Sequence, residues 1–159
     1  MGNRQVVERY ARSMAENDLD AQVGLMHYDY ECRYPQSGEV IRGSANLRRI
    51  VETYPETTGE GLSPKLGRII GTDDAWFSKP SWPAWTVVHV TGSGDDFTMT
   101  GTVTYPSGET WHAVVLLTLL DGKIWREVDY FAAPFPAPEW RAPYVERESE
   151  PVRSDGPET

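Results

Sequence analysis

Two polar side chains near the end of the chain have the types and the spacing of an acid/base pair. Apolar and polar residues alternate on both sides of Asp121-Gly122, which is a strong signal for a two-residue hairpin turn. Counting outward from that turn, we expect Val114 to lie opposite Asp129 and His112 to lie opposite Phe131. The sequence therefore predicts His112 on the same sheet face as Asp129, diagonal to it and within side-chain reach.

An imidazole beside a carboxylate in a dry cavity can move protons near neutral pH. Glu127 is two residues from Asp129 and should share its face, and repulsion between the two carboxylates would favour one staying protonated. Desolvation by Val114 and Phe131 would raise the pKa of Asp129, whereas a charged His112 would lower it. The sequence does not decide which of these two effects on the pKa is larger. We interpret Asp129 as the acid/base, His112 as its partner and Glu127 as a second carboxylate. The alternative is an ordinary hydrogen bond between side chains.

Helices are predicted in the first third of the chain. A first amphipathic helix has an apolar stripe at helical spacing: Val6, Val7, Tyr10, Ala11 and Met14. Asp18 can cap a second short helix, and a third begins near Gly43-Ser44 and is ended by Pro55. Between the second and third helices, the alternation from Tyr28 to Tyr34 predicts a half-buried strand.

After the third predicted helix, the sequence predicts mainly strands and turns. We expect strands over 65–71, 85–91, 97–105, 109–120 and 123–131, joined as an antiparallel meander after a loop over 56–64. A Pro-rich arm with aromatic residues begins at about residue 133. The sequence thus predicts one α+β domain over 1–145, with helices on one side of a curved sheet, and a disordered acidic tail over 146–159.

Composition excludes several classes of function. The 159 residues have a formal net charge of -9, which argues against nucleic acid and anionic membranes as partners. Cys32 is the single cysteine, and His27, His89 and His112 show no ligand spacing, so we expect no metal site. The sequence has no glycine-rich phosphate loop or dinucleotide fingerprint, and we expect no cofactor. Without a signal peptide or membrane segment, the expected location is the cytoplasm.

Two segments carry a resemblance to a known family. They are Tyr34-Pro35-Gln36-Ser37-Gly38-Glu39 with Ile41-Arg42-Gly43, ahead of the third helix, and Asp121-Gly122-Lys123-Ile124 leading to Asp129-Tyr130-Phe131. With the order of helices and strands, they resemble the NTF2-like superfamily, in its SnoaL-like polyketide cyclase branch, over roughly residues 3 to 135. The resemblance implies a cone closed at one end by helices, and a dimer formed through the sheet.

The last strand of this family commonly reads His-Arg-Asp-Tyr-Trp-Asp. Here Asp129 matches the aspartate, whereas Glu127 stands in place of the histidine and Ala132 in place of the final aspartate. The resemblance implies a cofactor-independent cyclase, dehydratase or isomerase that uses Asp129 on a polyketide- or terpenoid-like molecule. Tyr34 occupies the position of the isomerase base, which disfavours that route, and no Arg-x-Asp supports epoxide hydrolysis. A dehydratase-like set of Tyr, His and Asp side chains is compatible with the sequence.

The predicted ligand is an apolar small molecule held by side chains of the cone. The residues that we expect to line its site are Tyr10, Met14, Tyr30, Tyr34, Trp85, Val114 and Phe131. Because both faces of the predicted sheet are apolar, we also expect a homodimer. The alternative function is a non-catalytic domain of the same fold that binds a small molecule or serves in assembly.

Overall fold

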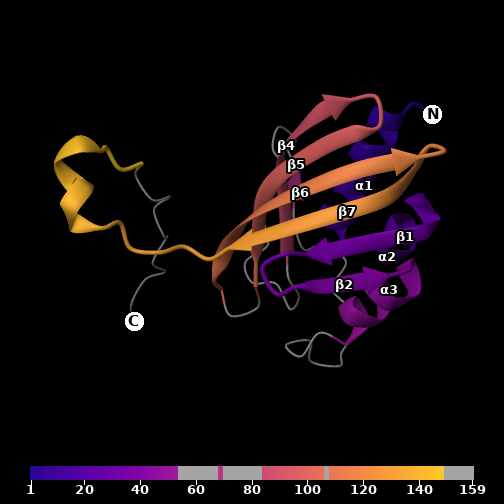
Figure 1. Cartoon of the computed structure of the whole chain (residues 1–159), viewed down its shortest axis with the longest axis horizontal. Helices are drawn as coiled ribbons and strands as arrows, with labels where there is room; N and C mark the ends of the chain where they lie inside the picture. Colours follow the sequence, from indigo (N-terminus) through magenta and orange to yellow (C-terminus); the bar gives the residue numbers. More distant parts are fainter. Residues whose placement is uncertain (54–67, 70–83, 106–107, 149–159) are drawn as a thin grey trace, which may run out of the picture.

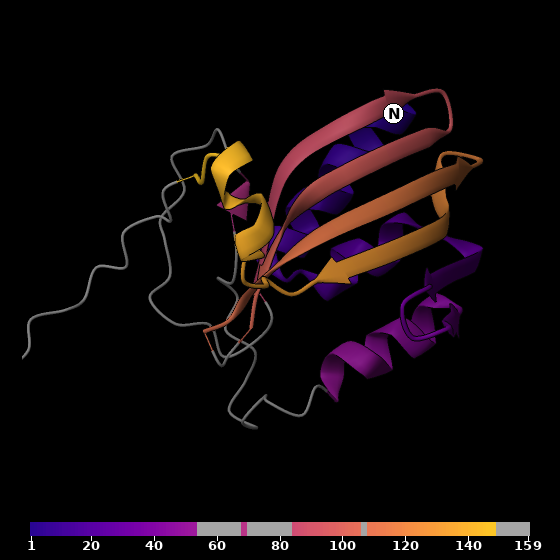
Figure 2. The same cartoon turned by 60° about the vertical axis from the view of Figure 1, so that its left-hand side comes forward.

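The structure is a computed structural model that describes residues 1–53, 68–69, 84–105 and 108–148. Within these residues the chain forms three α-helices, a seven-stranded sheet and one 3-10 helix (Figure 1). The helices pack against the concave face of the curved sheet, as the turned view shows (Figure 2). The α+β class predicted from the sequence is confirmed.

The helices form where the apolar stripes and caps predict them. Helix α1 (Asn3–Glu16) buries its apolar stripe and ends at Asn17, which takes a left-handed conformation with a φ of 53°. The carboxylate of Asp18 caps α2 (Leu19–Leu25) by accepting a hydrogen bond of 2.9 Å from the backbone N–H of Ala21. Helix α3 (Ser44–Glu52) follows Gly43, whose φ of 80° suits glycine.

The sheet has the strand order β2-β1-β7-β6-β5-β4-β3. Strands β4 to β7 form the predicted antiparallel meander. The sheet is nevertheless mixed, because β1 pairs with β7 and β3 pairs with β4 in parallel. A short strand β2, absent from the predicted elements, pairs with β1. The bounds are β1 Met26–Tyr34, β2 Glu39–Arg42, β3 Arg68–Ile69, β4 Ala84–Ser93, β5 Asp96–Thr104, β6 Thr110–Leu120 and β7 Lys123–Ala132.

The hydrophobic core lies between the concave sheet face and the helices. Its buried side chains come mainly from α1, β1, β5, β6 and β7, with Tyr10, Tyr30, Met99 and Leu117 among the largest. The predicted loop over 56–64 lies outside the described residues, and of the strand predicted over 65–71 only 68–69 are described. Among the described residues, no helix is both long and apolar enough to cross a membrane.

A β-bulge shifts the register of the central hairpin by one residue. Asp121 and Gly122 both have positive φ, 51° and 70°, as the predicted two-residue turn requires. Beyond the turn, Leu119 pairs with Ile124 but Thr118 pairs with Arg126, which leaves Trp125 as an extra residue in β7. From the bulge onward, every β7 side chain therefore lies on the face opposite to the one counted from the turn.

The prediction that His112 lies on the same face as Asp129, diagonal to it, is wrong for this reason. His112 pairs with Ala132, and Asp129 pairs with Val115. Val115 and Asp129 are buried on the inner face, whereas His112 and Val114 are exposed on the outer face. The predictions that His112 supports Asp129 and that Val114 lines the ligand site both depended on a hairpin without a bulge.

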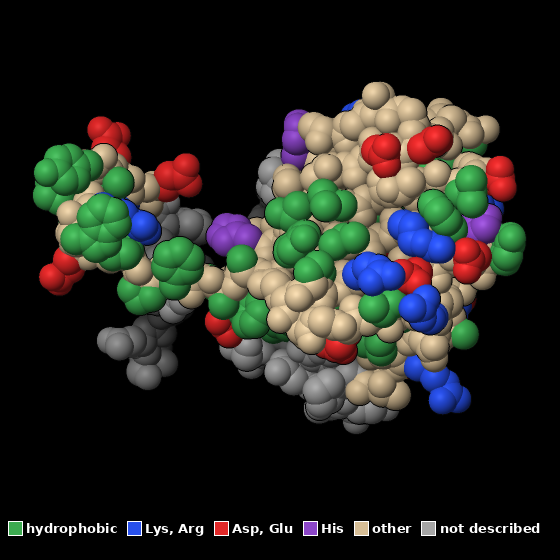
Figure 3. All heavy atoms as spheres, viewed as in Figure 1, with side chains coloured by type: hydrophobic (Ala, Val, Ile, Leu, Met, Phe, Trp, Pro, Cys, Tyr) green, Lys and Arg blue, Asp and Glu red, His purple; other side chains and the backbone are tan. Residues whose placement is uncertain are grey.

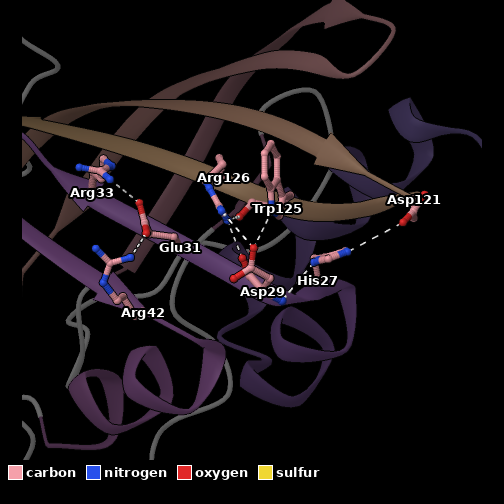
Figure 4. Close-up of polar contacts among 8 residues, drawn as sticks. All are labelled: His27, Asp29, Glu31, Arg33, Arg42, Asp121, Trp125 and Arg126. Carbon is pink, nitrogen blue, oxygen red and sulfur yellow. Dashed lines mark hydrogen bonds and ion pairs between the residues drawn. The ribbon is translucent and has the colours of Figure 1, made fainter.

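Contacts from β1, which is distant in sequence but adjacent to β7 in the sheet, hold the bulge in place (Figure 4). The indole Nε1 of Trp125 donates a hydrogen bond of 3.2 Å to Asp29 Oδ2 in β1, and Arg126 Nη2 donates one of 3.1 Å to the same oxygen. Arg126 Nη1 also donates to the backbone carbonyl of Asp29 at 2.5 Å. The guanidinium lies 4.0 Å from the centre of the Trp125 ring, in cation–π geometry. These donors lower the pKa of Asp29, which is therefore ionised as their acceptor.

We predict that Asp29→Ala loosens the bulge. Amides of β7 from Ile124 to Glu127 should exchange faster with solvent, and the melting temperature should fall, because two side-chain donors lose their shared acceptor. Hydrogen exchange with mass spectrometry measures the first effect and calorimetry the second. Asp20→Ala is the control, since it removes an exposed ion pair with Arg48 that involves no residue of β7. Equal protection of β7 in both variants would contradict the proposed anchor.

The chain leaves the sheet after β7 as an arm that extends away from the domain (Figures 1 and 2). This arm, residues 133–148, has prolines at positions 134, 136 and 138 and then the 3-10 helix η1 (Glu139–Tyr144). The arm follows the end of β7 at Ala132. Most of the predicted disordered tail, residues 149–159, lies outside the described residues.

Candidate active site

A buried pair of carboxyl groups lies at the centre of the inner sheet face. Glu127 and Asp129 in β7 are only 3% and 5% exposed. Both face the core because the bulge turns this part of β7 inward. Val115 of β6, which is fully buried, lies directly opposite Asp129. Because an isolated carboxylate is costly in such surroundings, the groups around the pair determine where its charge and its proton reside.

Two tyrosine hydroxyls hold Glu127. Tyr10 of α1 and Tyr30 of β1 each donate a hydrogen bond of 2.8 Å to Glu127 Oε2. Both rings are almost completely buried, and both were predicted to line the ligand site. Their hydroxyls instead bind a carboxylate oxygen, which makes them positioning residues for Glu127.

One oxygen of the buried Asp129 carboxyl group has no hydrogen-bond partner among the described residues. This oxygen is Oδ1, although ligand atoms of Asp129, Glu127 and Cys32 lie within 4.8 Å of one another. A buried carboxyl oxygen without a partner is uncommon, and it marks a place where a polar group of a ligand would be stabilised. Cys32, whose role the sequence did not reveal, pairs with Glu127 in the parallel ladder between β1 and β7.

The two carboxyl groups differ in how strongly they hold a proton. Burial raises the pKa of Asp129 well above its ordinary value, and the negative charge and hydrogen bond of Glu127 raise it further. Burial also raises the pKa of Glu127, but hydrogen bonds from Tyr10, Asp129 and Tyr30 counteract this effect by stabilising its ionised form. The arrangement favours one shared proton, held by Asp129 and directed at the Glu127 carboxylate.

The same cluster is the place where described residues could hold a metal ion. Cys32, Glu127 and Asp129 each offer one ligand atom, and these atoms lie within 4.8 Å of one another. Burial raises the pKa of all three groups, however, so their protonated forms are favoured. A cation would have to displace these protons and compete with the two tyrosine donors on Glu127. The donor set therefore suits proton transfer better than metal binding.

Aromatic rings form a wall beside the carboxyl pair. Phe131 lies two residues beyond Asp129, and its ring meets Tyr34 edge-on at a centroid distance of 5.6 Å and Trp85 at 5.8 Å. All three side chains are half-buried, and all three were predicted to line the ligand site. Burial raises the pKa of Tyr34, which keeps its hydroxyl neutral. Such a wall fits the flat face of an apolar molecule.

A second polar atom without a partner lies on the inner face. The indole Nε1 of Trp111 in β6 is buried and has no hydrogen-bond partner among the described residues, while its ring packs edge-on against Tyr105 at 5.3 Å. The register explains its position, because Trp111 alternates inward with Ala113 and Val115. A free donor at Trp111 and a free oxygen at Asp129 could both bind one ligand, one at each end.

A family model for a SnoaL-like domain matches residues 7–127, which is more than half of the chain. The chain belongs to the SnoaL-like family. This confirms the resemblance seen in the sequence, and the match includes Glu127 but ends two residues before Asp129. No curated protein matches the SnoaL-like chain.

Solved structures similar to the SnoaL-like chain have the NTF2-like fold. An NTF2-like protein of unknown function from Burkholderia xenovorans LB400 is 26% identical, with a TM-score of 0.68, 92% of this chain covered and 95% of that one. A candidate ketosteroid isomerase from Kribbella flavida DSM 17836 is 21% identical, with a TM-score of 0.69 and coverage of 93% and 90%. A candidate polyketide cyclase from Sinorhizobium meliloti is 16% identical, with a TM-score of 0.56 and coverage of 79% and 94%. These matches confirm the predicted fold.

The structure brings together most, but not all, of the predicted site residues of the SnoaL-like domain. Glu127 and Asp129 lie side by side with Tyr10 and Tyr30, and Tyr34, Trp85 and Phe131 form the adjacent wall. Met14 is buried in the helical side of the core. His112 and Val114 lie on the outer face. A separate groove of about 370 Å³ between β2 and α3 contains none of these residues.

Asp129→Asn should raise the free energy of unfolding of the SnoaL-like domain by an amount that grows with pH. A carboxyl whose pKa is raised on folding stabilises the fold below its unfolded pKa, about 3.9, and loses that stabilisation as the pH rises toward its folded pKa. The gap between variant and wild type should therefore widen above about pH 4, by at most about 1.4 kcal/mol per pH unit. Urea denaturation at several pH values measures it. A gap independent of pH would show that Asp129 is not protonated in the fold.

Tyr10→Phe and Tyr30→Phe should each destabilise the domain at neutral pH. Each change removes one hydrogen bond to the Glu127 carboxylate, and a bond to a charged group contributes about 1.5–3 kcal/mol. Chemical denaturation at pH 7 gives the loss, and Tyr34→Phe, which also removes a hydroxyl but one that does not bind Glu127, is the control. Losses no greater than that of the control would mean that the two tyrosines do not stabilise an ionised Glu127.

Proposed function

We propose that this SnoaL-like protein is a cofactor-independent acid/base enzyme of cyclase, dehydratase or isomerase type, acting on an apolar small molecule. The observation that carries the proposal is the buried Asp129, which lies beside Glu127 and whose Oδ1 has no hydrogen-bond partner in the part of the chain that the structure describes. A carboxyl with this environment is a common feature of catalytic acids and bases. The family and fold, which include proteins described as cyclases and isomerases, agree with it.

The geometry supports proton transfer by the pair as a unit. The free Oδ1 of Asp129 accepts a proton from the substrate, while the proton between the two carboxyls moves onto Glu127. The pair then changes from one negative charge to none, and the reverse transfer returns a proton to another atom of the same substrate. Abstraction and return at different atoms is the chemistry shared by cyclisation, dehydration and isomerisation. The tyrosine hydroxyls stabilise Glu127 when it is ionised.

The surroundings suggest the class of substrate. The wall of Tyr34, Trp85 and Phe131 would stack against a flat apolar body, as in polyketides or terpenoids. The unpaired Nε1 of Trp111 would donate to a carbonyl or hydroxyl at one end, and Asp129 would act at the other. As part of the same proposal, the protein functions in the cytoplasm and as a homodimer.

A second candidate is a non-catalytic binding domain. Tyr10 and Tyr30 are 1% and 2% exposed, so two of the predicted ligand-lining side chains instead fill the interior. In that case the carboxyl pair would bind one polar group of a ligand without moving a proton. The two candidates differ in what Asp129→Asn does, since the amide keeps the shape and a hydrogen bond but cannot transfer a proton.

The test begins with a thermal-shift screen of aromatic polyketides and terpenoids, followed by mass spectrometry of each stabilising compound after incubation. We expect Asp129→Asn to bind the substrate but to lower turnover by about 10²- to 10⁴-fold, with Glu127→Gln also impaired. His112→Ala is the matched control on the outer face of the same hairpin and should keep turnover within about twofold. Undiminished turnover in Asp129→Asn would overturn the mechanism, and binding without turnover in the wild type would favour the second candidate.

A further inference from the structure

The arm exposes three large aromatic side chains to solvent. Phe135 is 75% exposed, Trp140 is 76% exposed and Tyr144 is 85% exposed. Figure 3 shows apolar side chains gathered on this arm, which projects from the body of the molecule. Isolated exposed apolar residues are ordinary, but three large rings on one short segment indicate a surface that is covered in the functional assembly.

The arm is also stiff. Prolines alternate with other residues at positions 134, 136 and 138, and Pro138 has the extended φ and ψ of -64° and 139°. A proline-rich extended segment is preorganised, so its docking costs less conformational entropy than that of a flexible chain. It also continues outward from β7 and does not fold back over its own sheet (Figure 1).

A second uncovered apolar surface lies on the outer face of the sheet. It is defined by Val114, Leu116 and Tyr130, which are 37%, 40% and 42% exposed, together with the half-buried Val128. We call these four residues the outer strip. They come from β6 and β7, and they form the apolar patch in the middle of the body in Figure 3. The bulge creates the strip, because it turns Val128 and Tyr130 to the same face as Val114 and Leu116.

We propose that a second copy of the chain covers both surfaces, with the arm of each subunit docked on the outer strip of the other, an arrangement that rests on the homodimer of the proposed function. Each arm carries roughly 400 Å² of exposed aromatic surface. Each outer strip adds roughly 250 Å² of its own, so two arms docked on two strips would bury on the order of 1,300 Å² in total, which is within the range of specific stable interfaces. A two-fold dimer is the simplest closed arrangement, because it satisfies both arms and both strips.

Sedimentation equilibrium of the full chain tests the assembly. The wild type should be a dimer of the 17.9 kDa chain. Trp140→Ser/Tyr144→Ser, which alters the arm, and Leu116→Lys, which alters the strip, should each raise the dimer dissociation constant at least tenfold. Ile50→Ser is the control, since Ile50 is 43% exposed but lies on α3, outside both surfaces. Circular dichroism should show all variants folded, because every altered side chain is substantially exposed in the single chain.

A mixing experiment separates exchange of arms from other arrangements. The arm variant keeps its strips and the strip variant keeps its arms, so a mixed dimer has one intact contact, whereas each variant alone has none. A tagged arm variant should therefore capture the untagged strip variant at concentrations where neither self-associates. A monomeric wild type, a dimer that survives the arm variant, or failure of the two variants to complement each other would overturn the proposal. Arms folded on their own strips would give this last result.

Discussion

The architecture of the site depends on one extra residue in one strand. Without the bulge at Trp125, a regular hairpin from the Asp121-Gly122 turn would place Arg126 on the inner face and Glu127 and Asp129 on the outer one. The bulge reverses both assignments. It moves a cation out to the surface, where it binds Asp29, and it moves two carboxyl groups into the core. The inner face becomes acidic and the outer face gains its apolar strip through the same backbone irregularity.

Burial of two carboxyl groups requires compensation, and the molecule supplies it with neutral donors. Tyr10 and Tyr30 donate hydrogen bonds to Glu127, and the Asp129 carboxyl and the Cys32 thiol lie beside it. Neutral donors stabilise one negative charge without cancelling it, whereas a buried arginine or lysine would hold both carboxylates ionised. A pair left with a single charge and a single proton remains able both to accept and to release a proton.

Local patterns predicted much of this molecule. The apolar stripe of α1, the cap at Asp18, the Asp-Gly turn and the meander all depend on neighbours in sequence, and the structure has each of them. The alternation of side chains along a strand also predicted that Glu127 and Asp129 share one face, since no bulge lies between them. The faces of His112 and Val114 could not be obtained in this way, because counting across the hairpin fails at a bulge. That bulge is held by Asp29, 96 residues from Trp125, and no local pattern reports so distant a contact.

The parallel pairing of β1 with β7 joins segments from opposite ends of the domain. Cys32 and Glu127 become neighbours only when the last strand is added beside the first. Contacts between residues so far apart in sequence slow folding, because a large loop must close before they contribute stability. During synthesis, β1 would have an open edge toward the ribosome-bound remainder of the chain until β7 emerges. The acid pair and its tyrosine donors thus come together only when β7 joins β1, and a truncated product that lacks β7 has neither of the two carboxyl groups.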